Sequence, residues 1–371
     1  MFKFIQLVLC MLFVFGTMVM VSQVNADTMY AVIPSSPKPG GTSRWAWLWG
    51  KHMNNNLSGN IEQIDFKYIP GNRGKNALRK FESKLKYGNY MMTSHGGNAM
   101  ATLLEDVGNY DFRKYKPILI HPGNMLIPKR LDYNPKTDKQ KFALHPGGGS
   151  EPDHFAAGLM VCPETNDMDK FMKCFKEKVI IVKGMKSGGA RIIAFVNGEL
   201  NVSRDTFQNY TGNAKYKKAL TNNELEIWFH HCQMNYKTGQ WVDDPNSELK
   251  GLCFDNIFEQ THGFKPKGEV YDAYVLLRLW RDGIQKSFFV TTDSVYYHDM
   301  VTIATKTWFD EEFQKERLKK LGSYGVFIGQ DSEFIIKRMY EAVNTSTLKN
   351  AVRFVNEGLG YKAVVKHIHS P

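Results

Sequence analysis

The sequence predicts a two-lobed α/β fold, and three observations support this prediction. Short apolar segments alternate with amphipathic segments from about residue 30 to about residue 343, which is typical of α/β lobes with largely parallel sheets. Four of the expected strand-to-helix junctions carry a Gly-Gly pair. After the first 26 residues the chain still has 345 residues, which exceeds the usual size of one domain and indicates two.

The first 26 residues are expected to be a signal peptide. Lys3 precedes the apolar run Phe4–Val21, and Val24-Asn25-Ala26 places compact residues before Asp27. This is the layout of a secretory signal that is cleaved after Ala26. The alternative is an uncleaved anchor, because a run of this length just spans a bilayer. The cleavage site favours removal, so we expect residues 1–26 to be absent from the mature protein.

The chain is basic, with 48 Lys and Arg against 37 Asp and Glu and a formal net charge of +11. Such an excess suits a nucleic-acid binder, a surface attracted to anionic membranes, or a protein that gathers anionic ligands by electrostatic steering. The lysines are scattered and form no recognised nucleic-acid motif, so we expect no nucleic-acid partner. Charge alone does not identify the ligand.

Four cysteines follow the signal segment: Cys162, Cys174, Cys232 and Cys253. An even number in an exported chain favours disulfides. Pairing of sequence neighbours joins the first two and the last two, although four cysteines permit three pairings. His230-His231-Cys232 resembles a fragment of a metal site, but no second pair has ligand spacing, so we expect neither a metal nor a cofactor.

The alternation divides the chain into candidate strands and helices. Expected strands are Tyr30–Ile33, Asp65–Ile69, Tyr90–Thr93, Lys116–Ile120, Lys141–Leu144, Val179–Lys183, Lys286–Val290 and Tyr324–Ile328. Expected helices are Trp45–Asn55, Lys75–Lys86, Asp153–Val161, Asn166–Phe175, Ala190–Asn197, Asp272–Gln285, Glu311–Leu321 and Glu333–Val343.

The four glycine loops occupy residues 39–43, 94–98, 146–150 and 186–190. In a parallel sheet such junctions lie at the carboxyl ends of strands, where ligands bind. Glycine lets the backbone approach a ligand closely, and the N-terminus of the following helix attracts an anion. Glycine is also the ordinary residue of a tight turn, so one loop alone means little. Four in succession favour an anion site between two facing lobes.

Helix ends alone do not explain capture of an anion. One helix terminus contributes roughly 0.3–2 kcal/mol, whereas micromolar affinity needs about 8 kcal/mol. Neighbouring hydroxyls and a cation are expected to supply further bonds, with Arg204 as the preferred cation. The predicted ligand-binding residues are Gly40, Gly41, Thr42, Ser43, Thr93, Ser94, His95, Gly96, Gly147, Gly148, Gly149, Ser150, Lys186, Ser187, Gly188 and Arg204.

The order and spacing of these loops resemble a known family. The matching segments are Tyr30–Ser43, Ile69–Ala77, Tyr90–Asn98, Tyr110–Ile118, Phe142–Ala157, Ile181–Ala190, Phe195–Asn201 and Phe309–Leu321. Together they look like the substrate-binding component of tripartite tricarboxylate transporters, the Bug family. The resemblance spans nearly all of residues 28–360.

This resemblance implies a periplasmic-binding-protein-like (Venus flytrap) fold and a receptor rather than an enzyme. It implies a monomer in the periplasm that clamps a small carboxylate between its lobes and delivers it to the membrane permease subunits of a transporter. The lobes are then residues 27–124 plus 274–371 and residues 125–273. The first loop departs from the family pattern, with Thr42, Ser43 and Arg44 where an acidic residue is common. The segment 211–267 is also longer than in compact members, so the ligand's identity stays open.

Two other functions fit parts of the sequence. Ser150, Asp153 and His154 are the residue types of a hydrolase triad, but Gly-Gly-Gly-Ser-Glu is not a nucleophile elbow. A helix cap at Ser150 or Asp153 is the favoured interpretation. The second alternative is a phosphate or phosphonate receptor, because helix N-termini bind phosphate equally well.

The chain also has three tryptophans at alternate positions: Trp45, Trp47 and Trp49. Trp45 and Trp49 share a helical face, so packing against the sheet is favoured for them. A tryptophan that faced the cleft instead would stack on an aromatic acid.

Overall fold

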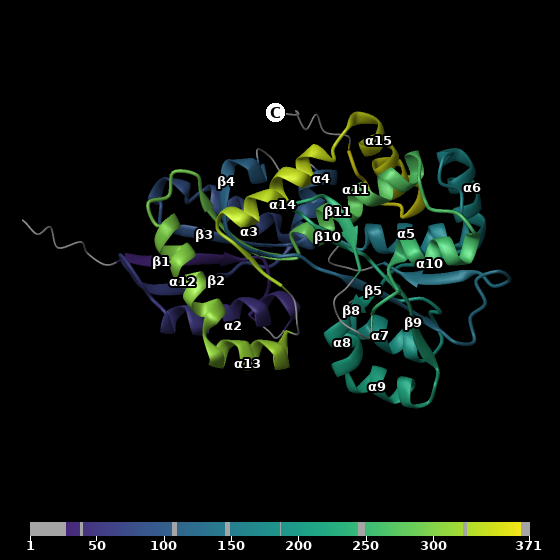
Figure 1. Cartoon of the computed structure of the whole chain (residues 1–371), viewed down its shortest axis with the longest axis horizontal. Coiled ribbons are helices and arrows are strands. Elements are labelled where there is room, and N and C mark those ends of the chain that lie inside the picture. Colours follow the sequence, from purple (N-terminus) through teal and green to yellow (C-terminus); the bar gives the residue numbers. More distant parts are fainter. Residues whose placement is uncertain are drawn as a thin grey trace, which may run out of the picture.

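The computed structural model describes residues 27–37, 40–105, 110–144, 149–185, 187–243, 249–321 and 325–364. The expected signal peptide, residues 1–26, lies outside these ranges. Within them, every helix is too short or too polar to cross a membrane. Two sheets, each covered by helices, lie side by side along the long axis of the molecule (Figure 1).

The first sheet has six strands in the order β13-β4-β12-β3-β1-β2. β1 pairs in parallel with β2 and β3, whereas β12 runs antiparallel to β3 and β4, and β13 runs antiparallel to β4. The prediction of largely parallel sheets is therefore wrong, because chain segments that return after residue 285 insert in the opposite direction. The strands are β1 (Asp27–Ile33), β2 (Ile61–Tyr68), β3 (Tyr90–His95), β4 (Tyr115–His121), β12 (Lys286–Thr291) and β13 (Phe327–Ile328).

Helices cover both faces of this sheet, and the alternation of side chains along β1 shows why. Met29, Ala31 and Ile33 face one core, with α2, α12 and α13, while Val32 faces the other core, with α3 and α4. This period of two is that of a strand buried on both faces. The helices are α2 (Gly41–Asn55), α3 (Lys75–Glu82), α4 (Gly96–Leu104), α12 (Tyr297–Phe309), α13 (Glu311–Lys320) and α14 (Gln330–Glu341).

The second lobe is built on shorter strands. β5 runs antiparallel to β8 and β9, β6 runs parallel to β7, and Val202 bridges the two groups through Lys129 and Phe142. Leu126 and Ala143 face a core with α7 and α9, whereas Ile127 and Phe142 face the core shared with α5 and α6. The strands are β5 (Met125–Arg130), β6 (Gln140–Ala143), β7 (Val179–Val182), β8 (Asp205–Thr206) and β9 (Leu225–His230), with a hairpin of β10 (Gln233–Asn235) and β11 (Gln240–Val242).

One long helix connects the two halves. α11 (Glu269–Gly283) contacts α4 and α14 on one side and α5 and α6 on the other. The predicted boundary between residues 273 and 274 falls inside α11, and the lobe limits stay a prediction. The remaining helices are α5 (Glu151–Val161), α6 (Met168–Lys178), α7 (Gly188–Val196), α8 (Phe207–Gly212), α9 (Ala214–Thr221), α10 (Phe254–His262) and α15 (Thr345–Arg353), with a π-helical turn at Phe354–Gly358.

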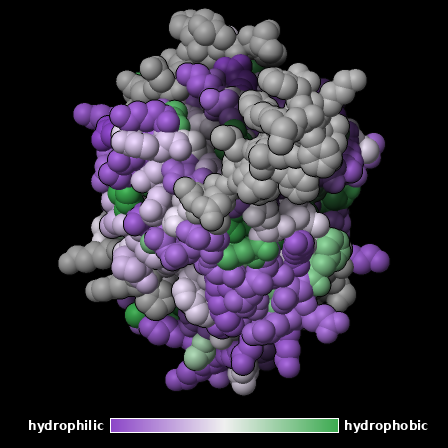
Figure 2. Space-filling model, turned by 90° about the vertical axis from the view of Figure 1, so that its left-hand side faces the viewer, coloured by the Kyte–Doolittle hydropathy of each residue, from purple (hydrophilic) through white to green (hydrophobic). Residues whose placement is uncertain are grey.

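The predicted disulfides are confirmed. Cys162 and Cys174 are joined with their Cα atoms 5.8 Å apart, and Cys232 is joined to Cys253 with a Cα separation of 4.9 Å. The first bridge joins the end of α5 to α6, and the second joins the end of β9 to the start of α10. Both therefore lie in the second half of the molecule, away from the first sheet. Figure 2 shows the end of the molecule formed by that sheet, where hydrophilic residues cover most of the described surface.

Candidate functional site

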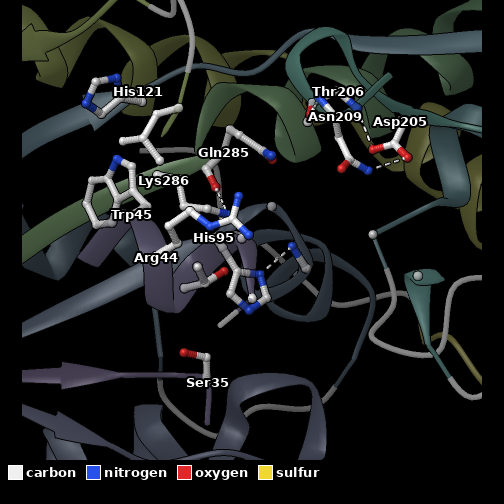
Figure 3. A pocket seen from close by; sticks show the side chains of 18 of the residues that line it. Ser35, Arg44, Trp45, His95, His121, Asp205, Thr206, Asn209, Gln285 and Lys286 are labelled. Atoms are coloured by element: carbon white, nitrogen blue, oxygen red, sulfur yellow. Dashed lines mark hydrogen bonds between the residues drawn. The ribbon is translucent and has the colours of Figure 1, made fainter. Parts of the chain in front are cut away.

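A cavity of about 1310 Å³ lies between the two sheets. Eight of the predicted ligand-binding residues line it: Gly40, Gly41, Thr42, His95, Gly96, Gly149, Gly188 and Arg204. Figure 3 shows His121 and Trp45 on one side, Arg44, Lys286, Gln285 and His95 in the middle, and Asp205, Thr206 and Asn209 on the other side. The structure thus brings residues of all four glycine loops to one space, and their role as ligand contacts stays a prediction.

Among the residues that the structure describes, the other predicted ligand contacts do not line this cavity. Gly147, Gly148 and Lys186 lie outside the described residues. Thr93 and Ser94 are fully buried within β3, and Ser150 is fully buried at the start of α5. The Ser43 hydroxyl bonds to the backbone of Gly40, and the Ser187 hydroxyl accepts a hydrogen bond from Ala190 N–H at 3.1 Å. These two hydroxyls therefore cap the starts of α2 and α7.

Helices α2, α4 and α7 begin at the cavity wall, with Gly41, Gly96 and Gly188 as their first residues. Unpaired backbone N–H groups and the positive end of the helix dipole favour a negative charge there. A Cβ added to Gly41 or Gly188 meets no atom within 4 Å, so both glycines leave the helix ends open. This part of the wall suits an anion.

Two other glycines serve a different purpose, because they let protein segments approach each other. A Cβ on Gly96 would lie 2.5 Å from the backbone oxygen of Arg281. Gly149 has a φ of +74°, and its added Cβ would lie 3.1 Å from Gly97 Cα. The third loop therefore packs directly on the start of α4. In these loops glycine is required by packing between segments, independently of any ligand.

His95 is a neutral donor at the wall. Its Nδ1 accepts a hydrogen bond from Gly97 N–H at 3.0 Å, so the ring proton is on Nε2. Burial, reinforced by Lys286, Arg281 and Arg73, lowers the pKa of His95 to about 3. The imidazole therefore stays neutral at physiological pH and offers one N–H to a ligand.

Lys286 follows α11 and lies opposite His95 in the antiparallel pair β12–β3. Its ammonium donates to the backbone oxygen of Gln285 at 3.1 Å, and no described acidic side chain forms an ion pair with it. Burial, with Arg281 and Arg204 nearby, lowers the pKa of Lys286 to about 7. An anion beside this group would stabilise its charged form.

Arg204, the predicted cation, lines the cavity but already has partners. Its Nη1 lies 2.5 Å from Asp153 Oδ2 and 2.7 Å from the carbonyl oxygen of Gly149. The same carbonyl accepts from Arg281 Nε at 3.1 Å. Burial lowers the pKa of Arg204, against the opposing effect of Asp153.

These residues belong to a set of neighbours that we call the charge ring, made of Arg204, Asp153, His231, Asp282, Arg281 and the Gly149 carbonyl. His231 Nδ1 lies 2.9 Å from Asp282 Oδ2, and its Nε2 lies 3.5 Å from Asp153 Oδ1. Arg281 Nη1 completes the ring at 2.6 Å from Asp282 Oδ1. Burial raises the pKa of Asp282, but Arg281 and His231 outweigh burial and hold it below its ordinary value. The ring ties α5, the end of β9 and the end of α11 together behind the cavity wall.

Arg191 is a cation that the sequence pattern did not single out. It lies in the first turn of α7 and lines the cavity, and only 4% of it is exposed. Its Nη2 lies 3.3 Å from Asp205 Oδ2, while Nε and Nη1 have no hydrogen-bond partner among the described residues. The available signal was an arginine four residues after Ser187 and two residues after the Gly188-Gly189 pair.

The residues of the supposed hydrolase triad do not form a relay. His154 Nδ1 bonds to the backbone oxygen of Ser150 at 2.6 Å, and its ring stacks on Phe142 with centroids 4.1 Å apart. The carboxylate of Asp153 binds Arg204 instead of His154. The Ser-His-Asp chemistry needs the carboxylate on the imidazole and the imidazole on the hydroxyl, which this arrangement does not provide.

The tryptophans divide as the helical pattern predicts. Trp45 and Trp49 are buried in the core beneath α2, where both rings contact His121. Trp47 is 48% exposed and lies at the cavity, with Lys320 Nζ 4.6 Å from its ring centroid. Trp45 also borders the cavity, so one side of the space is aromatic.

Two groups of described side chains have metal-ligand types close together. Cys232, Cys253 and Asp255 form one, and its sulfurs are joined in the disulfide. His52, Glu312 and Glu316 form the other, where Lys51 Nζ already lies 3.4 Å and 2.9 Å from the two glutamates. The sulfurs of the first group and the two glutamates of the second therefore already have bonds within the protein.

The fold of this chain is similar to that of several proteins whose structures have been solved. The periplasmic binding protein BugD covers 89% of this chain and 97% of its own, with 15% identity and a TM-score of 0.51. MatC from Rhodopseudomonas palustris with bound malate covers 88% of this chain and 98% of its own, with 14% identity and a TM-score of 0.51. A TctC solute binding protein from Polaromonas covers 87% of this chain and 98% of its own, with 10% identity and a TM-score of 0.55. No protein-family model matches the chain, and no curated protein matches its sequence.

The class is therefore the two-lobed α/β fold of periplasmic solute-binding proteins. Within that class, the chain has the fold of the Bug and TctC proteins over nearly its whole length after residue 26. The family resemblance seen in the sequence is confirmed at the level of the fold.

Proposed function

We propose that this chain is an extracytoplasmic receptor that captures a small organic carboxylate between its lobes and releases it to the membrane permease of a tripartite tricarboxylate-type transporter. The observation that carries the proposal is the cavity wall. Three helix N-termini, the neutral donor His95 and the cations Lys286 and Arg191 converge there from both halves of the chain. These are the groups that bind an anion.

The shared fold supports the same proposal. One protein with this fold holds malate, and the cavity of this chain lies between its two sheets. The expected signal peptide, the periplasmic location and the monomeric state belong to the proposal as well. Intact-mass analysis of the exported protein is expected to find Asp27 at its N-terminus.

A thermal-shift screen tests the proposal, because a ligand that binds only the folded state raises the melting temperature. The panel contains mono-, di- and tricarboxylates, aromatic acids, inorganic phosphate and phosphonates. We expect carboxylates to give the largest shifts, followed by calorimetry on the best one. Stabilisation by phosphate or phosphonates alone would favour the alternative receptor, and turnover of an ester or amide panel would favour a hydrolase.

A further inference from the structure

The hairpin β10–β11 belongs to the second half of the molecule by sequence but packs on the first half. It follows β9 of the second sheet, and its two strands pair with each other rather than with that sheet. Tyr236 in its turn is buried, and its ring meets the ring of Phe327 in β13 edge to face, with centroids 5.7 Å apart. The hairpin lies within residues 211–267, the segment that is longer than in compact members of the family that the sequence resembles.

Arg338 of α14 holds the turn of the hairpin. Its Nε donates to the backbone oxygen of Tyr236 at 3.2 Å, and its Nη2 donates to that of Lys237 at 3.3 Å. The guanidinium also lies against Gly239, where an added Cβ would be 3.4 Å from Cζ. Lys237 and Asp331 add an exposed ion pair at 3.0 Å, a kind that contributes little. Because a charged donor makes the stronger hydrogen bonds, Arg338 is the main polar link between α14 and the hairpin.

The base of the hairpin stays with the second half. The disulfide Cys232–Cys253 joins the residue before β10 to the start of α10. His230 Nε2, at the end of β9, lies 3.0 Å from Oδ1 of Asp243, the residue after β11. The hairpin is therefore fixed at its base and reaches across to α14 with its turn.

The two chain connections between the halves run side by side at the cavity. Residues 122–124 join β4 to β5, and residues 284–285 join α11 to β12. Gly123 N–H donates to the carbonyl oxygen of Asp282 at 2.7 Å, and both connections contribute to the cavity wall. Hinge motions of domains take place at a few residues in such loops and element ends. These connections are therefore the place for a hinge.

The hairpin and the cavity lie on opposite sides of these connections. α2 and α13, which border the cavity, cover one face of the first sheet, whereas α14 packs into the core on the other face. Among the described residues that line the cavity, none comes from the hairpin, residues 233–242. Figure 1 shows α2, α13, α7 and α8 in the lower part of the view, and β10, β11, α11 and α14 in the upper part. A rotation that narrows the cavity therefore draws the hairpin and α14 apart.

We propose that the hairpin is a brace behind the hinge that stabilises the open form of the cavity. Its contacts with Arg338 and Phe327 must loosen when the halves close, so they oppose closure. The apparent affinity of a protein for its ligand is proportional to the fraction of molecules in the binding-competent form. The brace therefore sets the ligand affinity without touching the ligand. This inference rests on the proposed function, because it requires that the halves close on a ligand.

A distance across the cavity mouth tests the brace in the absence of any ligand. Lys315→Cys in α13 and Lys217→Cys in α9 replace exposed residues on the two sides of the mouth. They accept spin labels selectively, because the four cysteines after residue 26 are joined in disulfides. Double electron–electron resonance then gives the distance distribution. We expect Arg338→Met to increase the population of short distances relative to the wild type. An unchanged distribution, or a shift to longer distances, would overturn the inference.

Lys337→Met is the matched control, because it removes a cation of the same helix whose ammonium lies 3.7 Å from Glu341 rather than at the hairpin. It should leave the distances unchanged, and a shift equal to that of Arg338→Met would contradict the role of Arg338. Phe327→Leu is a second variant, which removes the ring contact with Tyr236 and keeps an apolar side chain. It should shift the distances in the same direction as Arg338→Met, and it decides the question if Arg338→Met does not fold.

Calorimetry with malate connects the brace to binding. We expect Arg338→Met to bind malate about 3- to 10-fold more tightly than the wild type, because the closed fraction rises, and Lys337→Met to match the wild type. Weaker binding of malate by Arg338→Met would contradict the inference. If malate and the other carboxylates do not bind to the wild type, the proposed function fails, whereas the distance measurement still decides whether the hairpin opposes closure.

Discussion

Arg191 and Arg204 lie in the same half of the molecule, line the same cavity and are buried to a similar extent, yet their surroundings differ. Arg204 bonds to the fully buried Asp153 at 2.5 Å and to the Gly149 carbonyl, with one nitrogen, Nε, left without a partner among the described residues. Arg191 has a single contact at 3.3 Å and two such nitrogens. Proximity to a glycine loop therefore does not identify the ligand cation. Both arginines pair with a buried carboxylate, and they differ in how many of their nitrogens already bond to protein acceptors.

The largest effect is expected from breaking the charge ring. Arg204→Ala leaves Asp153 buried without its cation, and removal of one partner of a buried ion pair costs about 3–5 kcal/mol. Urea denaturation without ligand measures this loss of unfolding free energy. Arg191→Gln is the matched comparison and should cost less than Arg204→Ala, because the Arg191–Asp205 contact is longer, at 3.3 Å, and Asp205 keeps two other partners. A stable Arg204→Ala variant with lost ligand affinity would instead restore the role that the sequence predicted for Arg204.

Gly96 and Gly41 also differ in whether they pack against other segments or face open space, and the expected effect on stability is smaller. Gly96→Ala would force a Cβ to within 2.5 Å of the Arg281 backbone oxygen, and such overpacking typically costs about 1–3 kcal/mol. Gly41→Ala meets open space and should change stability by less than about 0.5 kcal/mol. Thermal melting of both variants without ligand tests this difference. Equal melting temperatures would mean that Gly96 is not needed for packing.

Gly41→Phe sharpens the comparison further. A large side chain at the start of α2 would occupy the cavity, so we expect unchanged melting without ligand and at least about tenfold weaker binding of the best carboxylate, the loss of one charge-assisted hydrogen bond. Calorimetry measures the affinity, with Gly41→Ala as the control. Full affinity in Gly41→Phe would place the ligand away from α2.

Much of the fold could be predicted because local patterns determine it. The eight expected strands all correspond to strands, since short apolar runs buried on both faces, as in β1 and β3, leave a clear signal in the sequence. β5 was missed because Pro128 interrupts its apolar run, and β9 because Leu225–His230 lies in a segment that looks polar overall. The direction of β12 depends on where α11 returns the chain, and no local pattern encodes that.

The sequence could predict which loops border the cavity, but not the role of each residue within them. The glycine pairs located four segments that do meet at the cavity, but they did not reveal which glycines face open space and which pack on other segments. Gly41 and Gly96 have similar sequence surroundings, and only the position of Arg281 separates them. Arg191 and Arg204 differ likewise through Asp153 and Asp205, whose neighbours are set by tertiary packing. Long-range ion pairing is the information that the sequence pattern lacks.

A pH dependence is expected to separate Lys286, proposed to bind the ligand, from the cations that pair with acidic residues. Lys286 has a pKa of about 7 in the folded chain against an ordinary value of 10.5, because of burial and the charges of Arg281 and Arg204. From about pH 7 to about pH 10 the unfolded chain therefore binds more protons at this residue than the folded chain. Stability without ligand should rise with pH in this window. His95, with a pKa of about 3, does not titrate there.

Ligand affinity should change in the opposite direction if Lys286 contacts the anion. The charged ammonium binds an anion and the neutral amine does not, so affinity is full below about pH 7 and falls above it, by up to about tenfold per pH unit. Calorimetry in buffers of different ionisation enthalpy should also show proton uptake on binding near pH 8. Lys286→Met is the control and should flatten both profiles, while Arg191→Gln should keep their slopes. Affinity that does not change between pH 6 and pH 9 in the wild type would exclude Lys286 from the ligand contacts and leave Arg191 as the main buried cation of the site.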